Sequence, residues 1–323
     1  MGLVSRVLEI THTTRYSYRE EVTESYGRAF LAPRECPGQT CLQHELTVSP
    51  AAELVHEHQD HYGNRSTYLE VLTPHTELVV TATSRVRIDR DADGVRAGLE
   101  RCLTPWEGAG RLALAEQDDD LHAHDFLLPS THVPPVDQAI DQATDQADDQ
   151  ADDQADDLVA AFAASVFTPG RPAGPAVRDL ISRIHRDLRY RPGVTSVTTT
   201  PAQVLAQRAG VCQDFAHLAI AVLRRCGLPA RYVSGYLETQ PPPGQPKLLG
   251  ADASHAWVSV LLPGLGWVDL DPTNDTLVDQ AHVLTAWGRD YSDVPPLKGV
   301  IFSEGSVSTL AVAVDVVPLR TDA

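Results

Sequence analysis

A cysteine, a histidine and an aspartate occur in this sequence in settings that suit an activated thiol nucleophile. Cys212 opens a segment of helical pattern, and His255 and Asp271 come later in the chain, each beside residues that favour strands. In such a set the thiolate attacks a carbonyl carbon, the imidazole transfers the proton and the carboxylate orients the imidazole. The alternative is that Cys212 is a small buried apolar residue, as most unpaired cysteines are.

The segment after Cys212 has the pattern of a helix with one buried face. Apolar residues recur at positions 215, 218, 219, 222, 223 and 226, which is the spacing of one helix face. Gly227 and Pro229 predict the end of this helix. We therefore expect Cys212 in the first turn, where unpaired N–H groups and the helix dipole favour a thiolate. Cys226 lies on the apolar stripe and is expected in the core.

Two strands joined by a short turn are predicted around His255 and Asp271. Residues 256–262 and 267–271 are rich in strand-forming side chains, and a Pro-Gly turn signal separates them. Side chains alternate between the two faces of a strand, so His255 and Asp271 share a face only if the turn has an odd number of residues. A turn of three or five residues centred on Gly264 meets this condition.

Several strings of the sequence resemble the transglutaminase-like superfamily, whose members carry a cysteine at a helix start, a histidine on a strand and an aspartate on the next strand. In that family the aspartate precedes Pro-Thr, which implies Asp271 rather than its neighbour Asp269 as the third residue. The amino-terminal stretch and the segment after residue 287 are similar to the bacterial branch. The resemblance covers nearly the whole chain apart from one insert. The matching strings are G-V-C-Q-D-F-A-H at 210–217, G-L-P-A-R-Y-V-S-G-Y at 227–236, H-A-W-V at 255–258, G-W-V-D-L-D-P-T-N at 266–274, G-R-D-Y at 288–291, D-V-P-P-L-K-G at 293–299, H-T-T-R-Y-S-Y at 12–18, L-A-P-R at 31–34, Y-G-N at 62–64 and P-H at 74–75.

The resemblance implies cysteine-dependent acyl transfer at an amide carbonyl of a protein or peptide substrate. Cys212, His255 and Asp271 are the expected catalytic residues, and neither a metal nor a cofactor is expected. Hydrolysis by water is favoured, and transfer to an amine, the transglutaminase reaction, stays open. A non-catalytic protein-binding module on the same fold is the alternative from another class, and the intact Cys–His–Asp set argues against it.

An oxyanion hole needs a second donor besides the backbone N–H of the nucleophile. Gln203, Gln207, Gln213 and Tyr190 are near Cys212 in the sequence. No pattern in the sequence singles out one of these four side chains.

Composition and charge limit the classes to which the chain can belong. Its 323 residues are enough for two domains with cores, and 42% of them are hydrophobic, as in globular proteins. The net charge of −18 argues against a nucleic-acid partner, although half of it comes from residues 137–157, which carry nine Asp and no Lys or Arg.

We expect no membrane contact, because no apolar run approaches the length of a membrane span and the first residues lack the apolar core of a signal peptide. Five scattered cysteines fit a reducing compartment, so a cytoplasmic protein of undetermined oligomeric state is expected.

The order of the patterns predicts an α+β protein with two domains. Residues 1–135 show alternating patterns and are predicted as a domain rich in antiparallel β-strands. Residues 136–157, an acidic Asp-Gln-Ala repeat, are predicted as a solvated linker that is disordered or forms a frayed helix. Residues 158–323 are predicted as a papain- or transglutaminase-like catalytic core, in which helices pack on an antiparallel sheet. Its final strand is expected at residues 307–317.

A run of histidines and acidic residues at 56–61 is the other dense group of potential ligands. His56 and His58 would face the same side of a strand, as metal ligands can. A turn at residues 62–64 follows, so an exposed strand end accounts for the run more simply. A metal-dependent enzyme centred on these histidines is the third hypothesis, and it predicts loss of activity on chelation.

Overall fold

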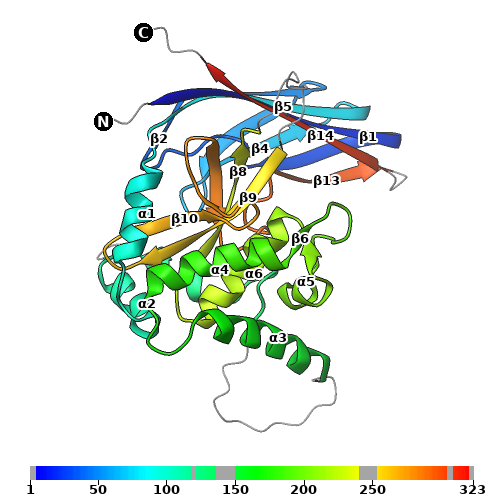
Figure 1. The fold of residues 1–323 in the computed structure, drawn as a ribbon. Coiled ribbons are helices and arrows are strands. Elements are labelled where there is room, and N and C mark those ends of the chain that lie inside the picture. Colours follow the sequence, from blue (N-terminus) through cyan, green and yellow to red (C-terminus); the bar gives the residue numbers. More distant parts are fainter. Residues whose placement is uncertain (1–4, 118–120, 136–149, 240–252, 304–307, 320–323) are drawn as a thin grey trace, which may run out of the picture.

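Two antiparallel sheets, a short parallel pair of strands and a layer of helices make up the protein. Its structure is a computed structural model that describes residues 5–117, 121–135, 150–239, 253–303 and 308–319. The strands are β1 (Arg6–Ala29), β2 (Gln39–Ser49), β3 (Leu54–Gln59), β4 (Arg65–Val71), β5 (His75–Ile88), β6 (Arg189–Tyr190), β7 (Ala209–Gly210), β8 (Ala230–Leu237), β9 (Ala253–Leu262), β10 (Gly266–Asp271), β11 (Thr276–Leu277), β12 (His282–Gly288), β13 (Leu297–Ser303) and β14 (Ser308–Leu319). The helices are α1 (Ala92–Arg101), α2 (Trp106–Ala115), the 3₁₀ helix η1 (Leu121–Leu127), α3 (Gln150–Val166), α4 (Ala173–Asp187), α5 (Pro201–Gln207) and α6 (Cys212–Arg225). Figure 1 shows the larger sheet on one side, the smaller sheet in the middle and helices α3 to α6 on the other side. The predicted α+β class is confirmed.

The longest strand, β1, holds the larger sheet together. Buried and more exposed residues alternate along its first part, so one of its faces is turned to the core. On one side β1 pairs with β5 in its first half and with β4 in its second half. The outer strands β2 and β3 add to β5 and β4. All these pairs are antiparallel, as predicted for the amino-terminal region.

The opposite side of β1 is covered by the last two strands of the chain. β13 pairs with residues 22–29 of β1, and β14 pairs with residues 7–18. Because both run antiparallel to β1, they lie end to end as one interrupted edge strand. The strand predicted at 307–317 is thus present, but it completes the larger sheet and not the sheet of the catalytic half. A domain boundary at residue 158 therefore does not separate the two sheets.

The smaller sheet has the strand order β11-β10-β9-β8-β12 and carries the helices on one face. Helix α6 lies against β8 and β9, and α3, α4 and α5 pack around it. Every residue of α6 from Asp214 to Arg224 is buried, so α6 is the central helix of the core. None of the helices in the described ranges is long and apolar enough to span a membrane.

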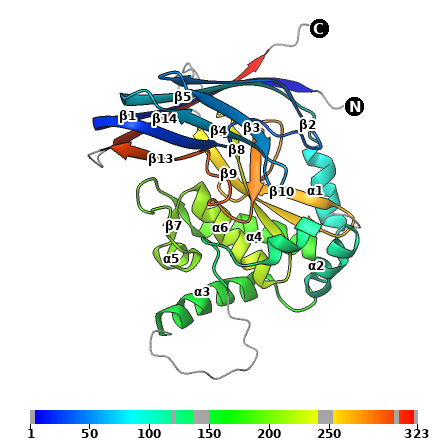
Figure 2. The same ribbon diagram turned by 180° about the vertical axis from the view of Figure 1, so that it is seen from behind.

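Residues 92–127 differ from the prediction, because they form α1, α2 and η1 instead of strands. Asp91 caps α1 by accepting a hydrogen bond from the Gly94 N–H at 2.9 Å. Leu99 of α1 and Ala109 of α2 are buried in the same apolar cluster as the helices of the catalytic half. Figure 2 shows α1 and α2 near β10, beside the smaller sheet. This part of the predicted amino-terminal domain therefore packs as part of the catalytic core.

Helix α3 begins inside the segment predicted as an acidic linker. It starts at Gln150, so residues 150–157 are helical rather than disordered. The remainder of the predicted linker, residues 136–149, lies outside the described residues. Further along, α3 buries Val159, Ala163 and Val166, which have the i, i+4, i+7 spacing of one helix face.

Two side-chain amides from the amino-terminal region form hydrogen bonds with the backbone of β12, an outer strand of the smaller sheet. Gln39 accepts a hydrogen bond from the Leu284 N–H at 2.9 Å and donates one to the Leu284 carbonyl at 2.7 Å. Asn64 makes the same two bonds with Trp287, at 2.9 Å and 2.8 Å. Both amides are buried, so they provide partners for the backbone N–H groups of Leu284 and Trp287. The Leu284 carbonyl also accepts a hydrogen bond from the Arg34 N–H at 3.1 Å. The two sheets are thereby held as one packed unit.

Candidate active site

Cys212 is the first residue of α6, as predicted. The Asp214 carboxylate accepts hydrogen bonds from the Val211 N–H and the Thr195 hydroxyl, each at 2.7 Å, and these bonds hold the start of the helix in place. A side chain at Gly210 would bring its Cβ within 2.8 Å of Asp214 Oδ2, so the position requires glycine. The Gly-Val-Cys-Gln-Asp string therefore places a partly exposed thiol at the positive end of a helix.

His255 and Asp271 face each other across the hairpin of β9 and β10. The register pairs Leu262 with Gly266, which leaves a turn of three residues, so the predicted odd turn is confirmed. His255 Nε2 lies 2.7 Å from Asp271 Oδ2, and both side chains are buried. The carboxylate that holds the imidazole is thus that of Asp271, two residues beyond the alternative Asp269.

The turn after β10 fixes the orientation of the Asp271 carboxylate. Oδ1 accepts hydrogen bonds from the N–H groups of Thr273 at 2.8 Å and Asn274 at 3.2 Å. Oδ2, which faces His255, also accepts one from the Asn274 amide at 2.6 Å. Burial works against the charge on this carboxyl group, but hydrogen bonds to His255, His282 and Asn274 outweigh burial and hold the pKa of Asp271 well below its usual value. The Asp-Pro-Thr-Asn string therefore supplies an ionised carboxylate in a fixed orientation.

His282 of β12 is a further member of this network that sequence reasoning missed. Its Nε2 lies 3.3 Å from Asp271 Oδ2, and its Nδ1 lies 2.9 Å from Asp279 Oδ1. The residue is 2% exposed. A buried chain of polar groups thus runs from Asp279 through His282 and Asp271 to His255. The sequence offers only a lone histidine three residues after an aspartate, which is not a specific signal.

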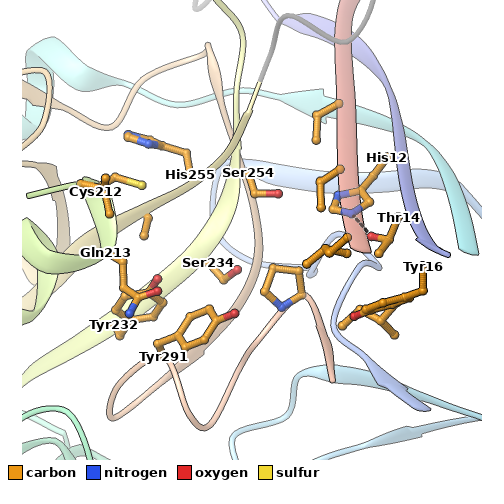
Figure 3. A pocket seen from close by; sticks show the side chains of 17 residues that line it. His12, Thr14, Tyr16, Cys212, Gln213, Tyr232, Ser234, Ser254, His255 and Tyr291 are labelled. Carbon is orange, nitrogen blue, oxygen red and sulfur yellow. Dashed lines mark hydrogen bonds between the residues drawn. The ribbon is translucent and has the colours of Figure 1, made fainter. Parts of the chain in front are cut away.

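His255 is placed to carry a positive charge beside Cys212. Burial lowers the pKa of His255, but hydrogen bonds to Asp271 and Cys212 and the charges of both groups outweigh burial and raise the pKa from 6.5 to about 10. Because Nε2 is engaged by Asp271, Nδ1 is the nitrogen that remains for the thiol. Figure 3 shows the Cys212 side chain next to the His255 ring. This geometry places an imidazolium next to the Cys212 side chain.

A cavity of about 400 Å³ opens at Cys212 and His255. The larger sheet supplies its opposite wall, through residues of β1 and β14. Figure 3 shows His12 and Tyr16 of β1 on one side of this space and the catalytic pair on the other. The amino-terminal region is therefore part of the candidate site.

The four side chains considered as a second oxyanion donor lie in different places. Gln213 lines the cavity next to Cys212. Gln203 completes the amino-terminal cap of α5, and Gln207 lines a separate hollow beside α3. Tyr190 lies on the short strand β6, and its pKa is raised by burial and by the charge of Cys212. Gln213 and Tyr190 are thus the candidates that accompany the backbone N–H of Cys212.

Two groups of side chains within the described ranges have ligand types that could hold a metal ion. They are His255, Asp271 and His282 in the core, and His61, His122 and Asp125 at the surface. Hydrogen bonds within each group account for its geometry, including one of 3.0 Å between His61 and Asp125. His56 and His58 lie with stacked rings on the exposed outer strand β3.

Two family models match the chain. The bacterial transglutaminase-like N-terminal region matches residues 8–87, and the transglutaminase-like superfamily matches residues 160–272, which include Cys212, His255 and Asp271. The uncharacterised protein Rv2569c of Mycobacterium tuberculosis (strain ATCC 25618 / H37Rv) is 43% identical over 318 residues, 97% of this chain and 93% of the relative. A protein-glutamine gamma-glutamyltransferase of Pseudomonas aeruginosa is 34% identical over 92 residues, 28% of this chain and 14% of the relative.

A solved structure shows the same fold over almost the whole chain. The structure is that of a candidate cysteine protease from Cytophaga hutchinsonii, with a TM-score of 0.71 and 22% identity, and the match covers 99% of this chain and 92% of that one. The fold agrees with the family matches in both halves of the sequence. The chain therefore belongs to the transglutaminase-like superfamily, in the branch that carries the bacterial transglutaminase-like N-terminal region.

Proposed function

We propose that this protein is a cysteine-dependent amide hydrolase that acts on a protein or peptide. The observation that carries the proposal is the arrangement of three groups at one cavity. Cys212 lies at a helix start, His255 lies beside it, and Asp271 holds the far nitrogen of the imidazole at 2.7 Å. Membership of the transglutaminase-like superfamily supports the same class of chemistry.

The proposed reaction has an acylation step and a deacylation step. The Cys212 thiolate adds to the amide carbonyl carbon, and the oxyanion that forms is stabilised by the Cys212 backbone N–H and a second donor. The His255 imidazolium donates its Nδ1 proton to the amide nitrogen, the C–N bond breaks and an amine leaves, with the acyl group held as a thioester on Cys212. Neutral His255 then takes a proton from water as the water attacks the thioester. The carboxylic acid leaves, and the thiolate–imidazolium pair is restored.

Water is proposed as the acceptor because the described part of the cavity wall offers no carboxylate for an ammonium group. Among the described residues that line the cavity, none is Asp or Glu. A lysine side chain that approached the thioester would lose hydration there without gaining a charged partner. Transfer to an amine is the second candidate, supported by the local match to a protein-glutamine gamma-glutamyltransferase.

Alkylation of Cys212 tests the proposal before a substrate is known. The rate of modification by iodoacetamide is measured from about pH 4 to pH 9 in the wild type and in His255→Ala, with the modified residue located by mass spectrometry. Cys226, on the same helix, is an internal control, because burial raises its pKa to about 12. Rapid modification of Cys212 that depends on His255 supports the proposal. A Cys212 that reacts as slowly as Cys226 contradicts it.

The acceptor is identified by product analysis. Peptides that contain glutamine or asparagine are incubated with the protein, with and without an added primary amine, and Cys212→Ala serves as the blank. Hydrolysis yields a cleaved or deamidated peptide in both conditions, whereas amine transfer yields an amine adduct that replaces the hydrolysis product. An adduct that dominates at low amine concentration would favour the second candidate.

A further inference from the structure

The wall that faces Cys212 is a ladder of residue pairs from two neighbouring strands. Residues directly opposite on antiparallel strands have neighbouring side chains. Each rung of this β1–β14 ladder combines a hydrogen-bonding side chain of β1 with an aliphatic side chain of β14. The rungs are His12 with Val314, Thr14 with Val312 and Tyr16 with Leu310, and all six residues line the cavity.

The aliphatic side of the ladder runs from the core out over the cavity. Val314 is 1% exposed and packs in the apolar cluster between the two sheets. Val312 and Leu310, two and four residues earlier on the same face of β14, are 49% and 58% exposed. Within the described part of the chain, β14 pairs with no strand on its outer side. An exposed apolar stripe on an edge strand has the character of a binding surface.

Among the described residues that line the cavity, Cys212 and His255 are the ones that our proposed mechanism uses in charged form. None of the cavity's described lining residues is Asp, Glu, Lys or Arg. His12 is 1% exposed and neutral, because burial lowers its pKa to about 4, and its Nε2 makes a hydrogen bond of 2.8 Å with the Thr14 hydroxyl. A charged substrate side chain would give up its hydration here without gaining a partner.

We infer that the acyl donor is an uncharged, apolar segment of an extended polypeptide that lies along the β1–β14 ladder. Its side chains rest on Val312 and Leu310, and the hydroxyl groups of Thr14 and Tyr16 offer hydrogen bonds to its backbone. The stripe is continuous with the cavity that contains Cys212, so its occupant is the chain that presents the carbonyl group. This inference rests on the proposed function, because it assigns the donor side of the same reaction.

Matched peptides test the chemical class of the donor. All carry the same reactive amide, and the flanking residues are leucine and valine in one set, aspartate in a second and lysine in a third. We expect kcat/KM to be about 10- to 100-fold higher for the apolar set than for either charged set.

Substitutions on the two faces of β14 locate the site. Leu310→Asp and Val312→Asp place a carboxylate on the ladder, whereas Ala311→Asp places one on the exposed opposite face of the same strand. Both ladder variants are expected to lower kcat/KM for apolar peptides by about 10- to 100-fold. They are also expected to abolish the preference of the protein for apolar peptides over lysine peptides. Ala311→Asp is expected to leave both quantities unchanged. The alkylation rate of Cys212 is expected to stay the same in all three variants, which separates loss of binding from loss of the nucleophile.

The outcomes distinguish this inference from the proposed function. Turnover that depends on Cys212 but shows the same selectivity in Leu310→Asp overturns the inference and leaves the proposed function standing. A wild-type protein that turns over no peptide contradicts the proposed function, and the inference falls with it. A dimer that Leu310→Asp dissociates, with unchanged peptide kinetics, assigns the stripe to self-association and overturns the inference.

Discussion

The charge on Asp271 is predicted to set the alkaline limit of catalysis. Asp271→Asn keeps an acceptor oxygen for the N–H groups of Thr273 and Asn274, so the turn after β10 is retained. The substitution removes the negative charge that faces His255 Nε2 at 2.7 Å. The perturbation is therefore mainly electrostatic, and besides His255 it reaches the other two side chains at Oδ2, the Asn274 amide and His282.

The expected shift follows from the balance of effects on His255. Burial lowers its pKa, and Asp271 together with Cys212 raises it from 6.5 to about 10. The net rise corresponds to about 5 kcal/mol in favour of the imidazolium, at 1.36 kcal/mol per pH unit. The imidazolium is the acid that protonates the leaving amine, so activity persists as the pH rises and is lost only when His255 deprotonates, near pH 10 in the wild type. Without the Asp271 charge, burial is no longer offset as strongly, and we expect the alkaline limb to move down by about 2 to 3 pH units. The loss of imidazolium alone then lowers kcat/KM at pH 8 by about 2- to 10-fold.

The assay is the pH dependence of kcat/KM, which reports the ionisations of the free enzyme. A proton NMR titration of His255 measures the same pKa without substrate. Asp269→Asn, on the same strand and two residues earlier, is the matched control and is expected to keep the wild-type alkaline limb. An alkaline limb that is the same in Asp271→Asn and in the wild type would refute this account of how His255 is charged.

Three further substitutions test other parts of the structure. His282→Gln removes a histidine that contacts Asp271 Oδ2 at 3.3 Å, and we expect kcat/KM to fall about 10-fold with KM unchanged, the effect of one buried hydrogen bond, measured by steady-state kinetics. Gln39→Leu leaves the buried N–H group of Leu284 without its partner and removes one of the two hydrogen bonds that the Leu284 carbonyl accepts, and we expect the free energy of unfolding in urea to fall by about 2–4 kcal/mol. Gly210→Ala drives a Cβ to 2.8 Å from Asp214 Oδ2, and we expect the melting temperature and the alkylation rate of Cys212 to fall together.

Each of these outcomes has a result that contradicts it. Wild-type kinetics in His282→Gln would show that Asp271 is oriented without His282. A Gln39→Leu protein that unfolds at the wild-type urea concentration would show that the amide pairing contributes nothing to stability. A Gly210→Ala protein with a lower melting temperature but an unchanged alkylation rate would separate the helix start from the reactivity of Cys212.

The placement of Cys212, His255 and Asp271 was predictable because each of these residues lies in a segment with a strong local signal. The spacing of apolar residues places Cys212 at the start of a helix, and Gly227 and Pro229 mark where that helix ends. This prediction needs no information about the rest of the fold. Parity across a tight hairpin places His255 and Asp271 on one face, because side chains alternate strictly along strands. Both arguments concern residues close together in the sequence, where backbone geometry limits the possible arrangements.

Contacts between distant segments could not be predicted in this way. Gln39 pairs with Leu284 across 245 positions, and nothing in either local string marks the other as its partner. The final strand β14 was recognisable as a strand, but the alternation of its side chains does not reveal which sheet the strand joins. His282 is a lone histidine in its own segment and gains significance only when β12 brings it to Asp271. The amino-terminal strings at 12–18 and 62–64 were recognised by resemblance, whereas their roles, as a cavity wall and as partner of β12, required the structure.

The place of β14 in the chain order has a consequence for biosynthesis. The residues from Cys212 to Asp271 leave the ribosome before β14, so a nascent chain carries Cys212, His255 and Asp271 before the aliphatic half of the wall opposite them exists. At that stage β1 lacks its β14 partner, and the apolar stripe on which we expect a polypeptide to rest is missing. We expect a chain that stops before residue 308 to keep an alkylatable Cys212 and to turn over no peptide, which comparison of the two rates would show. Synthesis of β14 would then be the step that makes the protein active, and precursors without this strand would not act on the proteins around them.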